Sequence, residues 1–289
     1  MFEDQDNITA TVWNPWIIDL ASLGINKSNV TTLTIGFERT GTTGGTGTVL
    51  IDDIRLYKTP PPLVDPVDPG TDNLVHSYTF DDGTANDSVG NANGTLEGDA
   101  TVSGGSLVLD GVDDWMSMPG SVIALNTYSE LSIECRFKSV AGGNTGNHML
   151  AAFREEGTGA NSTYGYKYLF ITSASSGNLS RAVIQTRSMD SSPWGKETSV
   201  SAATEHDDGL VHHFVCTVDA DYITFYIDGE LVGSAELAEG NEIAGIGQDA
   251  AYLGKGVYPV DPEWAGSVDR FSIYNKALSD AEVLYLAIH

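Results

Sequence analysis

The sequence is short of cysteine, of basic residues and of long apolar runs. Its two cysteines among 289 residues are too few for a disulfide-built scaffold, and their spacing matches no zinc site. Lys and Arg total 14 against 40 Asp and Glu, a formal net charge of -26 at pH 7, so nucleic acid is not an expected partner. No apolar run approaches the ~18 residues that a membrane span needs, so none is predicted.

The first ten residues, MFEDQDNITA, lack the basic and apolar regions of a signal peptide. An excess of carboxylates is typical of soluble extracellular or salt-tolerant proteins, and it supplies oxygen ligands for hard cations such as calcium. Solubility alone is the alternative explanation for this charge. We expect an extracellular or cell-surface protein whose secretion signal lies outside this chain.

A segment rich in proline and aspartate divides the chain into two parts. KTPPPLVDPVDPGTDN, residues 58–73, has no apolar period and is typical of an extended interdomain linker. Residues 1–57 hold three strand-like runs interrupted by GTTGGTGT. Because so few strands make a poor sandwich alone, we predict a partial β-sandwich here, the C-terminal part of a domain or strands that pack on something else.

The larger part, residues 74–289, alternates apolar and polar residues. In LSIECRFK, Leu131, Ile133, Cys135 and Phe137 share one face, the pattern of a half-buried strand. YITFYIDGELVGSAEL predicts a hairpin turning at Asp228-Gly229, and SDAEVLYLAI predicts one closing helix, with a capping box at its first turn. Many short strands separated by turns predict an all-β, antiparallel β-sandwich.

Five motifs in order carry a family resemblance: LVHSYTFDDGTANDSVGNANGT, LVLDGVDDWMSMPG, LSIECRFKS, HHFVCTVDADYITFYIDGELVG and AAYLGKGVYPVDPEWAGSVDRFSIYNKALSDAEV. They resemble a laminin-G-like domain, and more narrowly the concanavalin A-like jelly rolls of bacterial secreted multidomain proteins. The resemblance implies a jelly-roll β-sandwich over about residues 73–289, with one concave sheet. The partial sandwich at 1–57 resembles the closing strands of galactose-binding-like domains.

Sugar binding uses exposed aromatic rings beside planar polar groups, because a pyranose stacks one face on a ring while its hydroxyls need hydrogen bonds. The candidate ligand-binding residues lie in predicted loops or at strand ends: Trp194, Tyr164, Tyr166, Tyr258, Trp264 and Arg187, with Asn161 near them in sequence. In the alternative interpretation, Trp264 and Tyr258 cover the core edge and only Trp194, within SSPWGKE, is exposed.

The stretch FDDGTANDSVGNANGT, residues 80–95, is dense in Asp, Asn and Gly. Its spacing excludes an EF-hand, but calcium accepts oxygens from separate segments. The resemblance implies one structural calcium between this early loop and a late strand. Asx turns that hold the loop without metal are the alternative. The predicted ligands are Asp87, Asn91, a backbone carbonyl near Gly90, and Asp269, with Asp81 as a weaker candidate.

His212 and His213 are neighbours on a predicted strand, so they face opposite sides and cannot jointly bind one ion. We expect structural, hydrogen-bonded roles for both. Cys135 and Cys216 lie on the apolar faces of their strands, which favours buried free thiols over the alternative of a cross-strand disulfide.

No Glu-x-Asp-x-Glu motif of paired catalytic carboxylates occurs in the sequence. We therefore expect a non-catalytic module that binds an extracellular polysaccharide and accompanies a neighbouring catalytic domain. One alternative is a protein-binding adhesion or assembly module. The other is a divergent glycoside hydrolase or polysaccharide lyase of the same fold.

Overall fold

The computed structural model describes residues 64–144, 146–157, 165–175, 177, 179–187 and 192–289, together with 32, 34 and 35. The predicted partial sandwich at residues 1–57 lies outside the described residues except at those three positions. The chain divides into two units, and the second, Pro66–Ala287, holds the elements described below except the last residue of the closing helix, Ile288.

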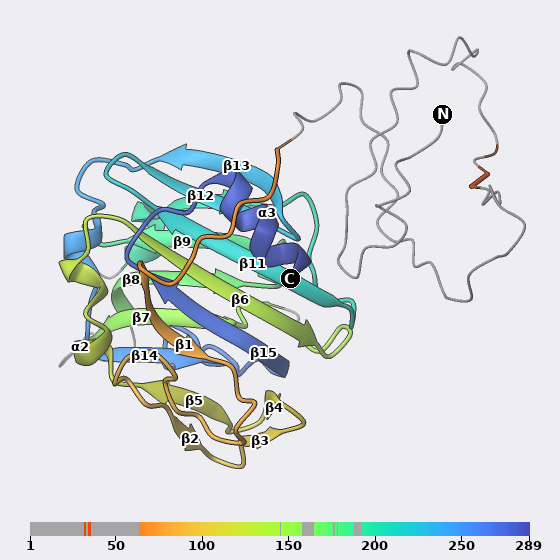
Figure 1. Ribbon diagram of the computed structural model, residues 1–289. Coiled ribbons are helices and arrows are strands. Elements are labelled where there is room, and N and C mark those ends of the chain that lie inside the picture. Colours follow the sequence, from red (N-terminus) through yellow and green to blue (C-terminus); the bar gives the residue numbers. More distant parts are fainter. Residues whose placement is uncertain are drawn as a thin grey trace, which may run out of the picture. The chain divides into compact units, whose positions relative to one another are not determined.

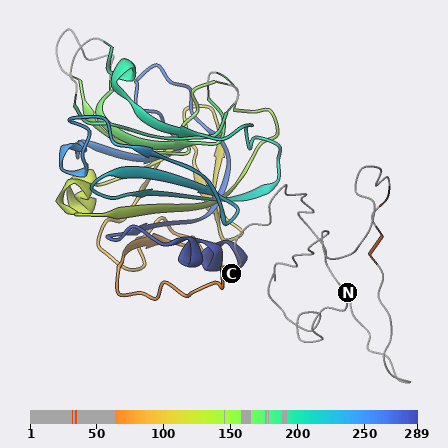
Figure 2. The ribbon, with the colours of Figure 1, turned by 90° about the horizontal axis from the view of Figure 1, so that it is seen from above.

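Two antiparallel sheets form the architecture of the described chain (Figure 1). Figure 2 shows them as stacked layers. The eight-stranded sheet runs in the order β13 (Glu230–Glu236), β12 (Tyr222–Ile227), β11 (Val211–Val218), β6 (Leu131–Ser139), β15 (Ala265–Tyr274), β4 (Ser106–Asp110) and β3 (Thr101–Ser103), while β1 (Leu74–Tyr78) also pairs with β15. The seven-stranded sheet runs in the order β10 (Thr198–Ser201), β9 (Arg181–Gln185), β8 (Gly165–Thr172), β7 (Ala151–Glu156), β14 (Ala250–Leu253), β5 (Trp115–Met118) and β2 (Thr95–Glu97).

Short helices lie between the strands: α2 (Gly120–Ile123), η2 (Leu125–Thr127), η4 (Pro193–Lys196) and η5 (Ile243–Gly245). With the closing helix α3 (Asp280–Ile288), they leave a mostly β chain. The predicted all-β jelly-roll sandwich is confirmed. None of the helices in the described part is long and apolar enough to cross a membrane.

The core lies between the two sheets and follows the alternation of the sequence. On β6, all four predicted residues, Leu131 through Phe137 at every second position, are buried in it. From the opposite sheet, Leu169 and Ile171 of β8 meet them. Burying one face of each strand is therefore what brings the two layers together.

The predicted hairpin and helix are also present. Asp228 and Gly229 both have positive φ values, 52° and 83°, as a two-residue turn between β12 and β13 requires. At the start of α3, the backbone amide of Ser279 donates to the Glu282 carboxylate at 2.9 Å, one of the two bonds of the capping box.

Helix α3 packs on the outer face of the eight-stranded sheet (Figures 1 and 2). Its Val283 and Leu286 join Val215 of β11, Tyr226 of β12 and Tyr274 of β15 in an apolar cluster separate from the main core. The end of the proline-rich segment reaches the same helix, since the amide of Val67 donates to the Ala281 carbonyl at 3.0 Å.

Candidate functional site

The outer face of the seven-stranded sheet carries a second apolar cluster. Because Leu169 and Ile171 of β8 point into the core, Tyr168 and Phe170 point outward. They pack with Met149, Ala152, Val183 and Val257, and Tyr258 lies against them from the loop after β14. This face is therefore apolar and aromatic, although it lies outside the sandwich core.

Trp194 stands at the edge of this cluster. Pro193 occupies the start of η4, where its fixed φ suits the first helical position, and Trp194 follows directly. The indole is 51% exposed, and its ring meets Tyr258 edge-on, with centroids 6.1 Å apart at 72°. The pair offers an exposed aromatic surface next to a half-buried phenol.

A row of polar groups continues from this pair. The hydroxyls of Tyr258 and Tyr168 lie 3.1 Å apart, and Tyr168 donates to Glu197 Oε1 at 2.7 Å. Arg181 Nη2 donates to Glu197 Oε2 at 2.7 Å, and its guanidinium lies over the Phe170 ring. Both Glu197 oxygens are thus fixed by neighbours, which orients them as planar hydrogen-bond acceptors.

The ionisation of these phenols is set mainly by burial. Burial, followed by the charge of Glu197, raises the pKa of Tyr168 well above its usual value, and burial also raises the pKa of Tyr258. Both remain protonated at neutral pH and can act as donors and acceptors.

Asp261 holds the loop that carries Tyr258. Its Oδ2 accepts the amide of Tyr258 at 2.9 Å, and the amide of Asp261 donates back to the Tyr258 carbonyl at 3.0 Å. Burial raises the pKa of the Asp261 carboxyl to about 6. The tight turn between them presents Tyr258 to Trp194.

The predicted aromatic residues divide between this site and the interior. Trp194 and Tyr258 are brought together. Trp264 is fully buried in the core, where its Nε1 donates to Ser173 Oγ at 3.0 Å, so its prediction as a ligand-binding residue is wrong. Tyr166, 1% exposed, is likewise not available to a ligand.

Of the remaining candidates, only Arg187 belongs to the described residues. Arg187 donates to the Glu239 carbonyl at 3.1 Å. Tyr164 and Asn161 lie outside the described residues. Sequence reasoning missed Tyr168, Arg181 and Glu197, although the alternation of YKYLFIT already indicates that Tyr168 and Phe170 face away from Leu169 and Ile171.

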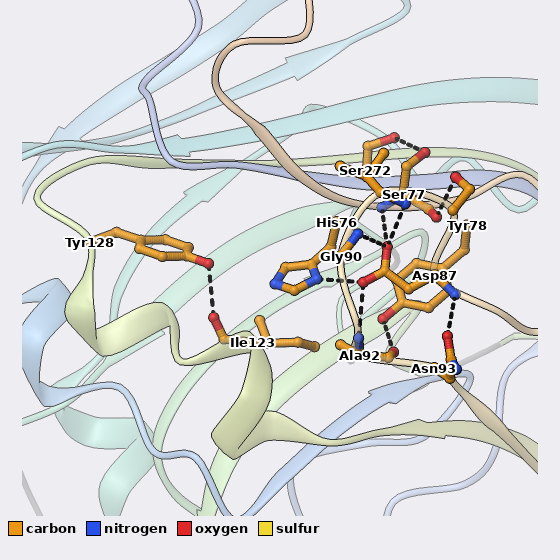
Figure 3. A network of polar contacts seen from close by, with 12 residues as sticks. His76, Ser77, Tyr78, Asp87, Gly90, Ala92, Asn93, Ile123, Tyr128 and Ser272 are labelled. Carbon is orange, nitrogen blue, oxygen red and sulfur yellow. Dashed lines mark hydrogen bonds and ion pairs between the residues drawn. The ribbon is translucent and has the colours of Figure 1, made fainter.

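The carboxylate of Asp87 accepts the hydrogen bonds that hold the early loop together (Figure 3). Its Oδ1 accepts the amides of Ser77 at 3.0 Å, Val89 at 3.1 Å and Gly90 at 2.9 Å. Its Oδ2 lies 2.6 Å from His76 Nδ1 and accepts the amide of Ala92 at 3.0 Å. One buried carboxylate therefore ties the loop both to itself and to β1.

Burial acts to raise the pKa of Asp87, but the hydrogen bonds from His76 and the backbone amides outweigh it and lower the pKa. The carboxylate is charged at neutral pH and its oxygens face five N–H donors. A cation would have to replace those donors, because a carboxylate has about four lone-pair sites in all. Asp87 thus fits the Asx-turn alternative and does not fit a calcium ligand in this arrangement.

Of the other predicted calcium ligands, Gly90 contacts Asp87 through its amide, whereas Asn91, Asp81 and Asp269 have no hydrogen bond to Asp87 in the described chain. Asn91 and Asp81 are exposed, and Asp269, in the bulge of β15, accepts from Ser106 Oγ at 2.9 Å. Gly90 is needed for packing, since a Cβ there would lie 2.5 Å from His76 Nδ1. Within the described chain, Asp87 and Asp269 share no hydrogen-bond partner.

A second group of acidic side chains, Asp99, Asp110 and Asp114, lies close enough to hold a metal ion. Asp114 is 1% exposed, and its two oxygens accept the amides of Asp110 at 2.8 Å and Gly111 at 3.1 Å. These bonds explain its position as a turn-forming residue without an ion.

The histidine and cysteine predictions are confirmed. His212 lies between Asp228, 2.9 Å from Nδ1, and Asp208, 3.1 Å from Nε2, while His213 contacts Glu134. Cys135 and Cys216 are buried free thiols, and burial raises the pKa of each.

Fold and site together define an antiparallel β-sandwich in which an exposed tryptophan lies at the edge of an aromatic cluster on one sheet. Residues 110–284 match the laminin-G family described as the concanavalin A-like lectin/glucanases superfamily. Because the match spans more than half of the chain, the protein belongs to this family. A comparison with curated proteins gives no match.

Solved structures share the fold at low identity. Domain 4 of AbnA, a GH43 extracellular arabinanase from Geobacillus stearothermophilus, in complex with arabinotriose, is 20% identical, with a TM-score of 0.58 and coverage of 74% of this chain and 98% of that chain. A structure of botulinum neurotoxin type C, a toxin whose cell entry depends on interaction with two ganglioside molecules, is 16% identical, with a TM-score of 0.54. The match covers 75% of this chain and 51% of that chain. The binding domain of botulinum neurotoxin DC, in complex with rat synaptotagmin II, is 14% identical, with a TM-score of 0.51 and coverage of 75% and 51%. The chain spans about half the length of the two neurotoxin structures.

Proposed function

We propose that this chain is a non-catalytic carbohydrate-binding module and that it binds a neutral glycan at the Trp194–Tyr258 pair. The observation that carries the proposal is the half-exposed Trp194 ring against Tyr258, whose hydroxyl leads through Tyr168 to the fixed oxygens of Glu197. A sugar ring stacks on the indole through its C–H face while its hydroxyls donate to the carboxylate and contact the Tyr258 hydroxyl.

The comparison with AbnA supports the proposal at the level of the ligand class. That domain is covered almost completely and holds an arabino-oligosaccharide. One neurotoxin interacts with gangliosides and another is in complex with a protein receptor, but only about half of each structure is matched. We therefore propose a glycan partner, with protein binding as the alternative outcome.

A module of this kind works by proximity. Holding an attached domain at its polymer raises the local concentration of that domain, and this needs no chemistry in the module itself. We propose that the chain serves a secreted or cell-surface protein with further domains. Glycan binding at this face needs no calcium, because the polar groups beside Trp194 are held by protein partners.

The test is affinity electrophoresis of the full chain in gels that contain arabinan, xylan, galactan, mannan or β-glucan, with calcium and with EDTA. We expect retardation by at least one neutral polysaccharide, equal in both conditions. Trp194→Ala weakens that binding about tenfold or more, the usual effect of removing a central aromatic anchor.

Tyr222→Ala is the matched control, because Tyr222 is also exposed, at 45%, but lies on the eight-stranded sheet. It should bind like the wild type. Equal retardation of wild type and Trp194→Ala would reject the site, and no retardation by any polysaccharide would favour the protein-binding alternative.

A further inference from the structure

A polar pocket of ≈ 280 Å³ opens beside the end of β7 and β8. It shares no lining residue with the Trp194–Tyr258 site. Its wall is formed by Asn126 of η2, Glu155 of β7, Lys167 of β8 and the segment Ala244–Asp249. The volume is just below the range for drug-sized ligands, so it has room for one small molecule.

Lys167 is held in the pocket wall by an irregular backbone. The pairing of β7 with β8 shifts register between Phe153 and Glu155, which leaves an extra residue on β8. At this bulge Lys167 has a φ of 47°, a left-handed conformation that costs a non-glycine residue free energy. Bulges of this type re-aim a side chain and often lie next to functional sites.

The surrounding contacts maintain this arrangement. The Lys167 ammonium lies 2.8 Å from Glu155 Oε2, and the Lys167 carbonyl accepts the amide of Gly247 at 2.7 Å. Gly247 has no room for a side chain, since a Cβ would lie 2.1 Å from the amide nitrogen of Glu155. Lys167 therefore occupies a position where glycine would be less strained, and its ammonium is held at the pocket wall by Glu155.

Asn126 gives a second, independent indication of a ligand. Its Oδ1 is buried and accepts no hydrogen bond from the described residues. A buried acceptor without a donor costs stability, and because Oδ1 itself is closed to solvent, a ligand hydroxyl supplies the missing donor only when the Asn126 side chain turns toward the pocket. Asp249 adds another acceptor, with only its Oδ2 used, by the amide of Glu156 at 3.0 Å.

The lining selects the chemistry of the ligand. Two carboxylates and the amide oxygens of Asn126 and Gln248 accept hydrogen bonds, the Lys167 ammonium and the two side-chain amides can donate them, and no aromatic residue lines the pocket. An anion is disfavoured by these carboxylates and by the net charge of -26. A metal ion is disfavoured because the carboxylate of Glu155 already forms an ion pair with the Lys167 ammonium. Several hydroxyl donors on a small neutral frame satisfy all these groups.

We propose that this pocket is a second binding site, which takes a monosaccharide-sized polyol such as one sugar unit, with Lys167 and Asn126 as its specific contacts. The proposal goes beyond the site at Trp194 and does not depend on it. A polysaccharide that reaches both sites gains affinity from their linkage.

The test is an NMR titration of the ¹⁵N-labelled full chain with glucose, galactose, arabinose, xylose and glucosamine, and separately with calcium chloride. The amides of Gly245 and Gly247 report on the pocket, and the Trp194 indole reports on the other site. We expect at least one sugar to shift the two glycine amides in a saturable manner.

Two variants separate function from folding. Lys167→Gly relieves the backbone strain and Asn126→Leu removes the unpaired acceptor, so both should have an unchanged or higher Tm while their affinity at the glycine amides falls about tenfold. Lys138→Gly, at an exposed strand position of β6, is the control, with a lower Tm and unchanged sugar binding.

Absence of glycine shifts with every sugar, or the same affinity in Lys167→Gly and Asn126→Leu, would overturn the proposal. Shifts with calcium chloride alone would also overturn it and identify a cation site. Loss of the Trp194 indole response with retained glycine shifts would instead count against the proposed function.

Discussion

At the scale of single residues, Asp87 decides how the early loop is held. Its charge is surrounded by N–H donors in a buried position, an arrangement that makes a charged hydrogen bond strong. The loop that looks in sequence like part of a metal site is organised by one carboxylate accepting from its own backbone. Gly90 belongs to the same arrangement, because a side chain there would displace His76.

Asp87→Asn should destabilise the protein by about 2–4 kcal/mol, because an amide group points N–H donors at N–H donors. Urea unfolding of variant and wild type measures the difference. Asp82→Asn is the matched control, since the exposed Asp82 accepts from its close neighbour Thr84 in the same loop, and it should have little effect. The wild-type midpoint should be the same with EDTA. A lower midpoint in EDTA would support a structural calcium ion.

At the scale of elements, His212 connects the loop before β11 to the β12–β13 turn. It lies between Asp208 and Asp228, one from each segment. Burial acts to lower the pKa of His212, but the hydrogen bond and charge of Asp228, followed by those of Asp208, outweigh it and raise the pKa.

Because the pKa of His212 is raised, the contribution of His212 to stability decreases as pH rises. The contribution of His212 is fully present below the unfolded pKa of about 6.5 and is lost as pH rises through the folded pKa. We expect the Tm difference between wild type and His212→Gln to shrink between pH 6 and pH 9. A difference that stays constant over this range would contradict the charged pair.

The elements were more predictable from sequence than the site. Alternation in LSIECRFK and the Asp228-Gly229 turn reflect local rules, so β6 and the hairpin follow directly from them. Trp264 could not be placed in this way, because its contacts are distant in sequence, such as the hydrogen bond of its indole to Ser173, some ninety residues earlier. The Glu197 contacts likewise depend on the pairing of β8 with β9 and of β9 with β10, which no local pattern specifies.

At the scale of the whole molecule, charge and shape select the class of glycan. A net charge of -26 repels uronic or sulfated polymers, while an aromatic surface is indifferent to charge. We expect neutral polysaccharides to retard the protein and polygalacturonate or alginate to leave it unretarded at low salt, where charge repulsion is least screened. Stronger binding of the anionic polymers at low salt would contradict this account.

The most direct test of the central claim is a crystal structure of the chain with the oligosaccharide of the polysaccharide that binds it. The account predicts a sugar ring stacked on Trp194, with hydroxyls within hydrogen-bond distance of Glu197 and Tyr258. A sugar bound elsewhere, with Trp194 left free, would contradict it.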